Sequence, residues 1–388
     1  MPAFWLSKEG LPALNGNATM PEAMLALAPP SVRLWAEVSV AVAIGCLCCL
    51  ALAGATFYRR SREKHPLTMM MLVLWTFVLC LPFFLPMRFG LSASTVAILN
   101  FIGSWKAVDC FMGTQPTALT SNGFFPFAVH FASPVEFKLL TAKGDPNTSQ
   151  KESIQRATKD LWQKEGIEVV FTVLGLSFCA SVRNVLQFVS TPAPPPLVHF
   201  GHEALFLYTE VWTIYLFLSF FSGVFSTLLA LLQFQAKTMF DQPLLKSTSI
   251  SEFWSRRWNM LIHGLFKRTV FRPLTRQGFP PWSAGALAFV ISGLFHEYAF
   301  SLAQPSLRQS LGRCMCFFVA QAPIVSVEKA LRKQIRVPWP FKEHSAACTI
   351  AWTVLLVPMA PLFLHPLRTS GVLDEIFSLV PRFVVTAA

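Results

Sequence analysis

Eight apolar stretches, each long enough to cross a membrane as a helix, dominate this sequence. A helix needs about 20 apolar residues to span roughly 30 Å of hydrocarbon. Because lipid offers no partner for backbone polar groups, stretches of this length are expected to be helical. The sequence therefore predicts an all-α, polytopic transmembrane bundle. Its expected spans are about 32–57, 67–86, 89–112, 167–190, 203–234, 282–303, 311–330 and 347–366.

The composition indicates a membrane protein, and the distribution of its basic residues predicts the orientation in the membrane. Hydrophobic residues make up 53% of the chain and charged residues only 13%, which is outside the usual range of soluble domains. The net charge of +12 would favour a nucleic-acid partner in a soluble protein, but no such partner is expected here. Cytosolic loops retain Lys and Arg, and most of the 32 basic residues fall in 59–66, 113–166, 235–281 and 329–346. Both termini are therefore predicted to be lumenal.

The chain divides into one membrane domain and two tails. Residues 1–31 are rich in proline and poor in charge, so we expect a flexible lumenal tail. Residues 32–366 form the predicted transmembrane domain, and 367–388 a C-terminal tail. The 9 cysteines lie in or near apolar stretches and indicate packing residues. His199 and His202 have no further ligand nearby apart from Glu203, so no metal site is predicted.

A basic and aromatic segment lies in the largest predicted cytosolic loop. At helical spacing, one side of 252–270 is polar and the other mainly apolar. One interpretation is an interfacial helix that faces anionic lipid with Trp anchors. The other is the mouth of a site for a substrate with phosphates and an acyl chain. The polar side has Glu252, Arg256, Asn259, His263 and Lys267, and the apolar side has Trp254, Trp258, Leu261, Leu265 and Thr269.

An ionisable pair, His296 and Glu297, interrupts the sixth predicted span. Such groups are costly in hydrocarbon and mark candidate functional sites. His296 has two interpretations: a buried neutral imidazole that bonds a neighbouring helix, or a general base that takes a proton from a hydroxyl. Glu297 lies about 100° further round the helix, so we expect a supporting role. A proton relay through both residues would instead indicate a transporter.

The two segments together resemble a known family. FWSRRWN at 253–259 and SGLFHEYAF at 292–300 are similar to motifs of the plant-type wax synthase branch of the membrane-bound O-acyltransferase superfamily. Arg256 stands where the superfamily's diacylglycerol and sterol enzymes have an Asp, which favours the wax synthase form. The specific resemblance covers about 250–305, and the hydrophobic profile extends it loosely over 32–366.

The resemblance implies a buried tunnel, an endoplasmic reticulum membrane location and His296 as the catalytic base with Asn259 as its polar companion. The implied reaction moves an acyl group from acyl-CoA, a co-substrate, to a lipophilic alcohol, with a long-chain fatty alcohol as first choice. No cofactor is expected. Sterol, diacylglycerol and terpenoid acceptors remain alternatives, as do a proton-coupled transporter and an inactive scaffold. The expected substrate contacts are Phe253, Trp254, Arg256, Arg257, Trp258 and Lys267, with Cys314 and Cys316 as a fallback nucleophile.

Overall fold

The computed structural model describes residues 4–5, 23–62, 66–116, 123–140, 150–189, 196–303, 311–334 and 357–387. Long helices form most of the molecule. They are α1 (Val32–Arg62), α2 (Pro66–Cys80), α3 (Gly90–Phe111), α6 (Gln150–Val189), α7 (Pro196–Leu231), α12 (Pro281–Ser301) and α13 (Arg313–Gln334).

Shorter elements connect and flank these helices. The short helical segments are η2 (Leu81–Phe84), α5 (Phe124–Ala132), α8 (Pro243–Lys246), α9 (Ile250–Glu252), η3 (Phe253–Arg257), α10 (Met260–Phe266), η4 (Lys267–Phe271), α11 (Arg272–Arg276), η6 (Val357–Met359), α15 (Ala360–Thr369) and α16 (Val372–Ser378). The strands are β1 (Phe4–Trp5), β2 (Ala23–Ala28), β3 (Phe137–Leu139), β4 (Phe234–Ala236) and β5 (Arg382–Ala387).

Helices occupy the first seven predicted spans, and the eighth, 347–366, lies partly outside the described residues. Within the part of the chain that the structure describes, four helical segments are long and apolar enough to cross a membrane. These segments are Val32–Arg59, Glu152–Gln187, Gly201–Leu231 and Arg313–Leu331. The mostly helical fold is confirmed, and the expected number of about eight spans stays a prediction.

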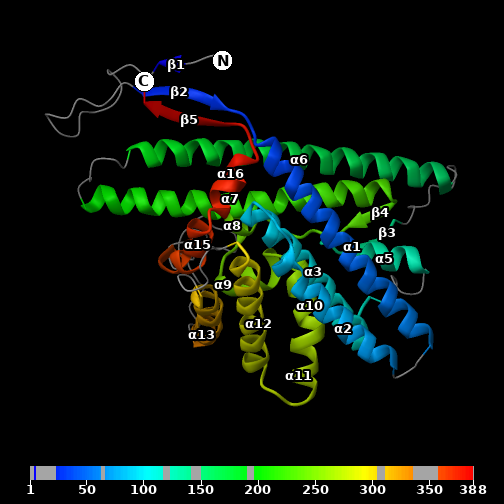
Figure 1. Cartoon of the computed structure of the whole chain (residues 1–388). Coiled ribbons are helices and arrows are strands. Elements are labelled where there is room, and N and C mark those ends of the chain that lie inside the picture. Colours follow the sequence, from blue (N-terminus) through cyan, green and yellow to red (C-terminus); the bar gives the residue numbers. More distant parts are fainter. Residues whose placement is uncertain are drawn as a thin grey trace.

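Helices α6 and α7 lie side by side, while α10, α11, α12 and α13 lie together on one side of this pair (Figure 1). Helix α1 crosses the pair and packs against α3. Gly103 permits this close approach, because a Cβ at that position would lie 2.6 Å from Sγ of Cys49. A continuous core joins α1, α3, α6, α7, α12, α13, α15 and α16, with Phe295 and Leu364 among its buried members.

Helix α3 carries several polar residues although it is enclosed by other helices. Its polar residues Ser92, Asn100, Ser104, Lys106 and Asp109 are all buried. Buried polar groups need partners, and the Nδ2 group of Asn100 donates to the carbonyl of Val78 on α2. The polar side chains of α3 therefore face protein rather than lipid.

Lys106 and Asp109 lie three residues apart on α3, but among the described ion pairs they do not pair with each other. Lys106 Nζ donates instead to the backbone carbonyls of His130 and Ser133. Asp109 Oδ2 accepts from Arg268 Nε at 2.9 Å, and the same guanidinium donates from Nη2 to Glu136 Oε1 at 2.7 Å. Lys106 thus bonds the end of α5 and the residue after it, whereas Asp109 bonds Arg268 of η4. The second contact fixes η4 against α3.

Both predicted tails contain regular elements where they are described. Strands β2 and β5 pair antiparallel, with β1 on the other side of β2, and both lie near the chain ends in Figure 1. Helix α16 buries Leu373, Ile376 and Phe377 in the main core. Strands β3 and β4 form a second small antiparallel sheet. None of these strands is expected from the apolar spans alone.

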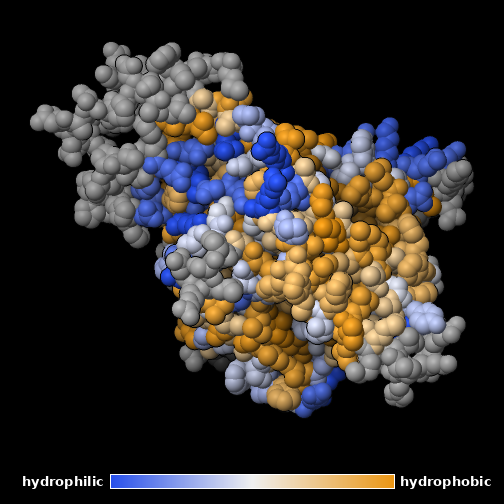
Figure 2. Space-filling model, viewed as in Figure 1, coloured by the Kyte–Doolittle hydropathy of each residue, from blue (hydrophilic) through white to orange (hydrophobic). Residues whose placement is uncertain are grey.

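The surface has a broad hydrophobic area on the side where α1 and α2 lie (Figure 2). Exposed apolar side chains on these helices include Val40, Leu47, Leu72, Val73 and Phe77. Soluble monomers rarely expose a continuous apolar area of this kind. The area therefore fits contact with lipid.

Candidate active site

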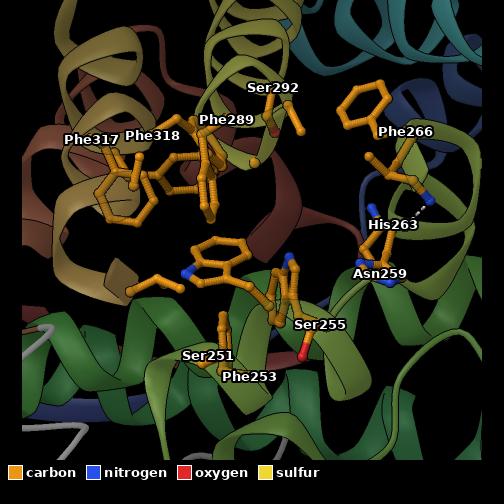
Figure 3. A pocket seen from close by; sticks show the side chains of 18 of the residues that line it. Ser251, Phe253, Ser255, Asn259, His263, Phe266, Phe289, Ser292, Phe317 and Phe318 are labelled. Atoms are coloured by element: carbon orange, nitrogen blue, oxygen red, sulfur yellow. Dashed lines mark hydrogen bonds between the residues drawn. The ribbon is translucent and has the colours of Figure 1, made fainter. Parts of the chain in front are cut away.

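A large cavity lies between α7, α12, α13 and the segment from η3 to η4, with a volume of about 1030 Å³. In Figure 3, Asn259 and His263 lie on one side of it, and Phe289, Phe317 and Phe318 lie on the other. The lining is mostly apolar, which suits a ligand with a long hydrocarbon part. The polar and charged residues in its lining are Tyr208, Ser251, Ser255, Arg256, Asn259, His263, Lys267, Ser292, His296, Ser326 and Lys329.

The segment 252–270 is not the single amphipathic helix that its spacing predicts. A π-helical turn, η3, ends at Arg257, and Trp258 is extended with φ −98° and ψ 125°. Asn259 then begins α10, and a second π-helical turn, η4, follows at Lys267. Because the helix is interrupted, side chains of both predicted faces, including Trp254 and Asn259, line the cavity.

Asn259 begins α10 in the left-handed conformation, with φ 44° and ψ 65°. Asn adopts this conformation more readily than most residues. Its Oδ1 accepts a hydrogen bond from the backbone N–H of Ile262 at 3.3 Å, which caps the helix. The carboxamide has two further N–H donors on Nδ2. Since Asn259 lines the cavity, Nδ2 is the group that it can offer to a bound substrate.

His296 is held in one orientation on α12. Its Nδ1 lies 2.7 Å from the carbonyl oxygen of Ser292, one turn earlier. A carbonyl oxygen only accepts, so Nδ1 carries the proton and Nε2 has the free lone pair of a neutral imidazole. Ser292 and His296 both line the cavity. The imidazole is therefore in the tautomer that a general base requires.

Four phenyl rings surround the imidazole of His296. Phe318 is stacked on it, with ring centroids 4.4 Å apart and an interplanar angle of 26°. Phe295, Phe300 and Phe363 meet it edge to face, with centroids 4.8, 5.7 and 5.3 Å away. The imidazole thus lies in an apolar, aromatic environment on the cavity.

Glu297 does not line the cavity. Its Oε1 accepts a hydrogen bond from the backbone N–H of Met315 at 2.9 Å, in the first turn of α13. A carboxylate is favourable at a helix N-terminus. On the same face of α12, Gly293 leaves room for Met315, whose Cα would lie 3.1 Å from an added Cβ. Glu297 and Gly293 therefore join α12 to α13.

Trp254 connects the η3 segment to both helices. Its Nε1 donates to Oε1 of the buried Gln321 on α13 at 3.1 Å. The indole also contacts Phe289 on α12 and Phe318 on α13, with centroids 5.9 and 5.8 Å away. Phe253 stacks on Trp258 with centroids 5.2 Å apart. These expected substrate contacts all line the cavity and also hold its wall together.

Three basic residues, Arg256, Lys267 and Lys329, line the cavity and are exposed to solvent. Among the ion pairs of the described residues, none involves these three cations. They therefore offer positive charge at the edge of an otherwise apolar cavity. The helical spacing of 252–270 predicts Arg256 and Lys267 on one polar side. Lys329 lies beside the cavity only because α13 packs against α12.

Arg257 is buried and lies elsewhere, in a cluster of ion pairs. Its Nη2 donates to Glu252 Oε1 at 2.6 Å and its Nη1 to Asp241 Oδ2 at 2.9 Å. Burial alone would raise the pKa of Glu252, but hydrogen bonds from Thr248 and Arg257 hold it below its usual value. The structure does not bring Arg257 to the cavity with the other expected phosphate contacts, so it acts on the position of η3.

His263 is a second imidazole in the cavity lining. Burial and the nearby positive charge of Lys267 lower its pKa. Both histidines of the cavity are thus candidates for proton transfer, but only His296 has its tautomer fixed by a backbone carbonyl. Cys314 and Cys316, the fallback nucleophiles, are absent from the lining. In the described part of the chain, no group of three or more His, Cys, Asp or Glu residues is arranged to hold a metal ion.

The comparisons with known proteins identify the class. Residues 236–320, which contain Asn259 and His296, match the model of the membrane bound O-acyl transferase family. This segment belongs to that family, and the chain is a multi-pass membrane protein that is similar to acyltransferases over most of its length.

Within the family, the chain is similar to wax synthases. It is 27% identical to the long-chain-alcohol O-fatty-acyltransferase of Simmondsia chinensis, over 76% of this chain and 80% of that protein. It is 26% identical to the probable long-chain-alcohol O-fatty-acyltransferase 1 of Arabidopsis thaliana, over 80% of this chain and 83% of that protein. It is also 31% identical to acyl-CoA–sterol O-acyltransferase 1 of Arabidopsis thaliana, over 38% of this chain and 43% of that protein.

Proposed function

We propose that this protein transfers the acyl group of an acyl-CoA to a long-chain fatty alcohol and forms a wax ester. The observation that carries the proposal is that His296 and Asn259, which lie far apart in the sequence, line one apolar cavity. The names of the relatives that align over most of the chain support the same acceptor.

In the proposed reaction, Nε2 of His296 takes the hydroxyl proton of the alcohol. The alcohol oxygen attacks the thioester carbonyl carbon, and an oxyanion develops on the acyl oxygen. Nδ2 of Asn259 donates a hydrogen bond to that oxyanion, as preorganised donors do in acyl transfer. The C–S bond then breaks, and the imidazolium returns its proton to the departing sulfur. Free CoA thiol leaves, and His296 is again neutral. Direct transfer needs no enzyme nucleophile, which agrees with a lining that contains no cysteine among the residues the structure describes.

We expect the charged part of acyl-CoA to lie at the edge of the cavity, near Arg256, Lys267 and Lys329. Replacement of Arg256 and Lys267 by Ala should raise the KM for acyl-CoA about tenfold, while kcat stays within about twofold. A hydrogen bond to a charged group contributes about 1.5–3 kcal/mol, and solvent screening reduces this contribution at exposed residues. The measurement is initial-rate kinetics in microsomes.

Arg276→Ala is the matched control for this pair. Arg276 is exposed at the end of α11 and does not line the cavity, so its loss removes a positive charge from the same segment of the chain without touching the site. An unchanged KM in the double variant would assign Arg256 and Lys267 to lipid contact instead.

The acceptor is tested by the products. The chain is expressed in a host that lacks neutral-lipid acyltransferases, and the host is fed a mixture of fatty alcohols, sterols, diacylglycerols and terpenoid alcohols. Wax esters should then exceed every other ester at least tenfold. The lipid extract is profiled by mass spectrometry, with His296→Asn expressed in parallel as the background. Predominance of steryl esters would instead favour the sterol acceptor, which the similarity to acyl-CoA–sterol O-acyltransferase 1 makes the second candidate.

The proposal also includes the membrane arrangement. We infer about eight spans, a cavity that continues as a tunnel from the cytosolic face, and location in the endoplasmic reticulum membrane with both termini lumenal. The basic residues of 235–281 support this orientation, because they place the cations of the cavity edge on the side where acyl-CoA is available.

A further inference from the structure

His296 lacks the acidic partner that commonly stabilises a catalytic imidazole. In hydrolase triads, an Asp accepts from Nδ1–H and stabilises the imidazolium that forms when the base takes its proton. Here Nδ1 donates to the neutral carbonyl of Ser292, and the carboxylate of the adjacent Glu297 accepts from the backbone N–H of Met315 on α13. Among the described residues, no ion pair includes His296. Positive charge on this ring must therefore be stabilised in another way.

Phe318 presents the group that can do this. The face of an aromatic ring carries partial negative charge and its edge partial positive charge, and a cation within about 6 Å of the ring face is attracted to it. Of the four phenyl rings around His296, only Phe318 lies nearly parallel to the imidazole, at 26° and 4.4 Å. The interplanar angles of the other three are 65°, 65° and 68°.

The position of Phe318 is fixed by its surroundings. The side chain is only 3% exposed, and the rings of Trp254 and Phe317 pack against it with centroids 5.8 and 5.1 Å away. One turn earlier on α13, the backbone N–H of Met315 donates to Glu297 on α12, and the absence of a side chain at Gly293 lets Met315 pack closely there. The ring is thus in place before the imidazole becomes charged, so no reorganisation is needed when it does.

We propose that Phe318 is a positioning residue that stabilises the imidazolium form of His296 through its ring face and so takes part of the role of a triad carboxylate. The inference rests on the proposed function, in which His296 is the base. A neutral aromatic partner suits this cavity because it leaves the acyl chain and the alcohol without a buried charge beside them.

The test is a series of fluorinated phenylalanines incorporated at position 318 of the full-length chain. Fluorine withdraws electron density from the ring face but changes the shape of the side chain little. We expect kcat to fall with each added fluorine, to about a tenth with three, which corresponds to about 1.4 kcal/mol. The KM for acyl-CoA should stay constant, since the ring acts on the charged imidazole only.

The same series at Phe377 is the matched control. Phe377 is also only 3% exposed and its ring faces the guanidinium of Arg183, but it does not line the cavity, so kcat should change less than twofold. A kcat at position 318 that is independent of fluorine content, with wax esters still formed and His296→Asn still inactive, would overturn the role of Phe318 and leave the proposed reaction intact. Activity in His296→Asn would contradict the proposed reaction itself.

Discussion

His296→Ala should yield a protein that inserts and accumulates normally but has lost almost all transfer activity. General base catalysis contributes about 10²- to 10⁴-fold, and the described part of the cavity lining offers no other imidazole with a fixed tautomer. The side chain is not part of an ion pair or a helix cap, so its removal should leave the bundle folded. Initial rates with an acyl-CoA and a long-chain alcohol, normalised to protein in the membrane, measure the effect.

Two further variants separate chemistry from packing at this position. In His296→Asn, the carboxamide Nδ2 can still donate to the carbonyl of Ser292, but no basic nitrogen replaces Nε2, so the activity should be as low as in His296→Ala. His263→Ala removes the other imidazole of the cavity, and we expect a loss of less than about tenfold, since it lacks the assigned role. If the two histidines gave the reverse order of losses, His263 would be the base.

Asn259→Asp should reduce kcat by about 10²- to 10³-fold, the loss typical of one oxyanion donor. Aspartate retains a side-chain oxygen that can accept from Ile262 N–H, and Asp is as good a helix cap as Asn. The two N–H donors are replaced by an acceptor with negative charge, which opposes the oxyanion. Kinetics and thermal stability of the purified protein measure the two effects separately.

Asn259→Gly is the complementary control. Glycine adopts the left-handed conformation of this position freely, so it preserves the entry into α10 while it removes the whole carboxamide. We expect it to be about as inactive as Asn259→Asp and to remain folded. Full activity in either variant would mean that Asn259 acts only on the structure of α10.

The sequence predicts the helical class of the fold because its apolar stretches have the length of membrane spans, and a span needs no distant partner to be recognised. It does not predict the terminal sheet, since β2 and β5 pair across almost the whole chain. Nor does the sequence predict the interruption of the helix at Trp258 and Asn259. Two π-helical turns shift the phase of the side chains, so a regular helical spacing assigns their faces incorrectly.

Some residues of the candidate site can also be predicted from the sequence, and others cannot. Asn259 and His296 are predictable because each belongs to a short motif, and the structure brings both to one cavity. Arg257 looked equivalent to Arg256, but the carboxylates of Glu252 and Asp241 bind its guanidinium. Lys329 and Phe318 carry no local signal at all, because their place beside the cavity depends on how α13 packs on α12.

The contact between α12 and α13 sets a limit on attempts to change which substrates the enzyme accepts. Gly293 and Glu297 fix the register of the two helices through Met315, and none of these three side chains lines the cavity. A library that varies cavity residues such as Phe289 and Val325 can alter the shape available to an alcohol while it leaves this register untouched. Redesign that reaches Gly293, Glu297 or Met315 alters the alignment of His296 with its aromatic neighbours, and we then expect the turnover of all substrates to fall together.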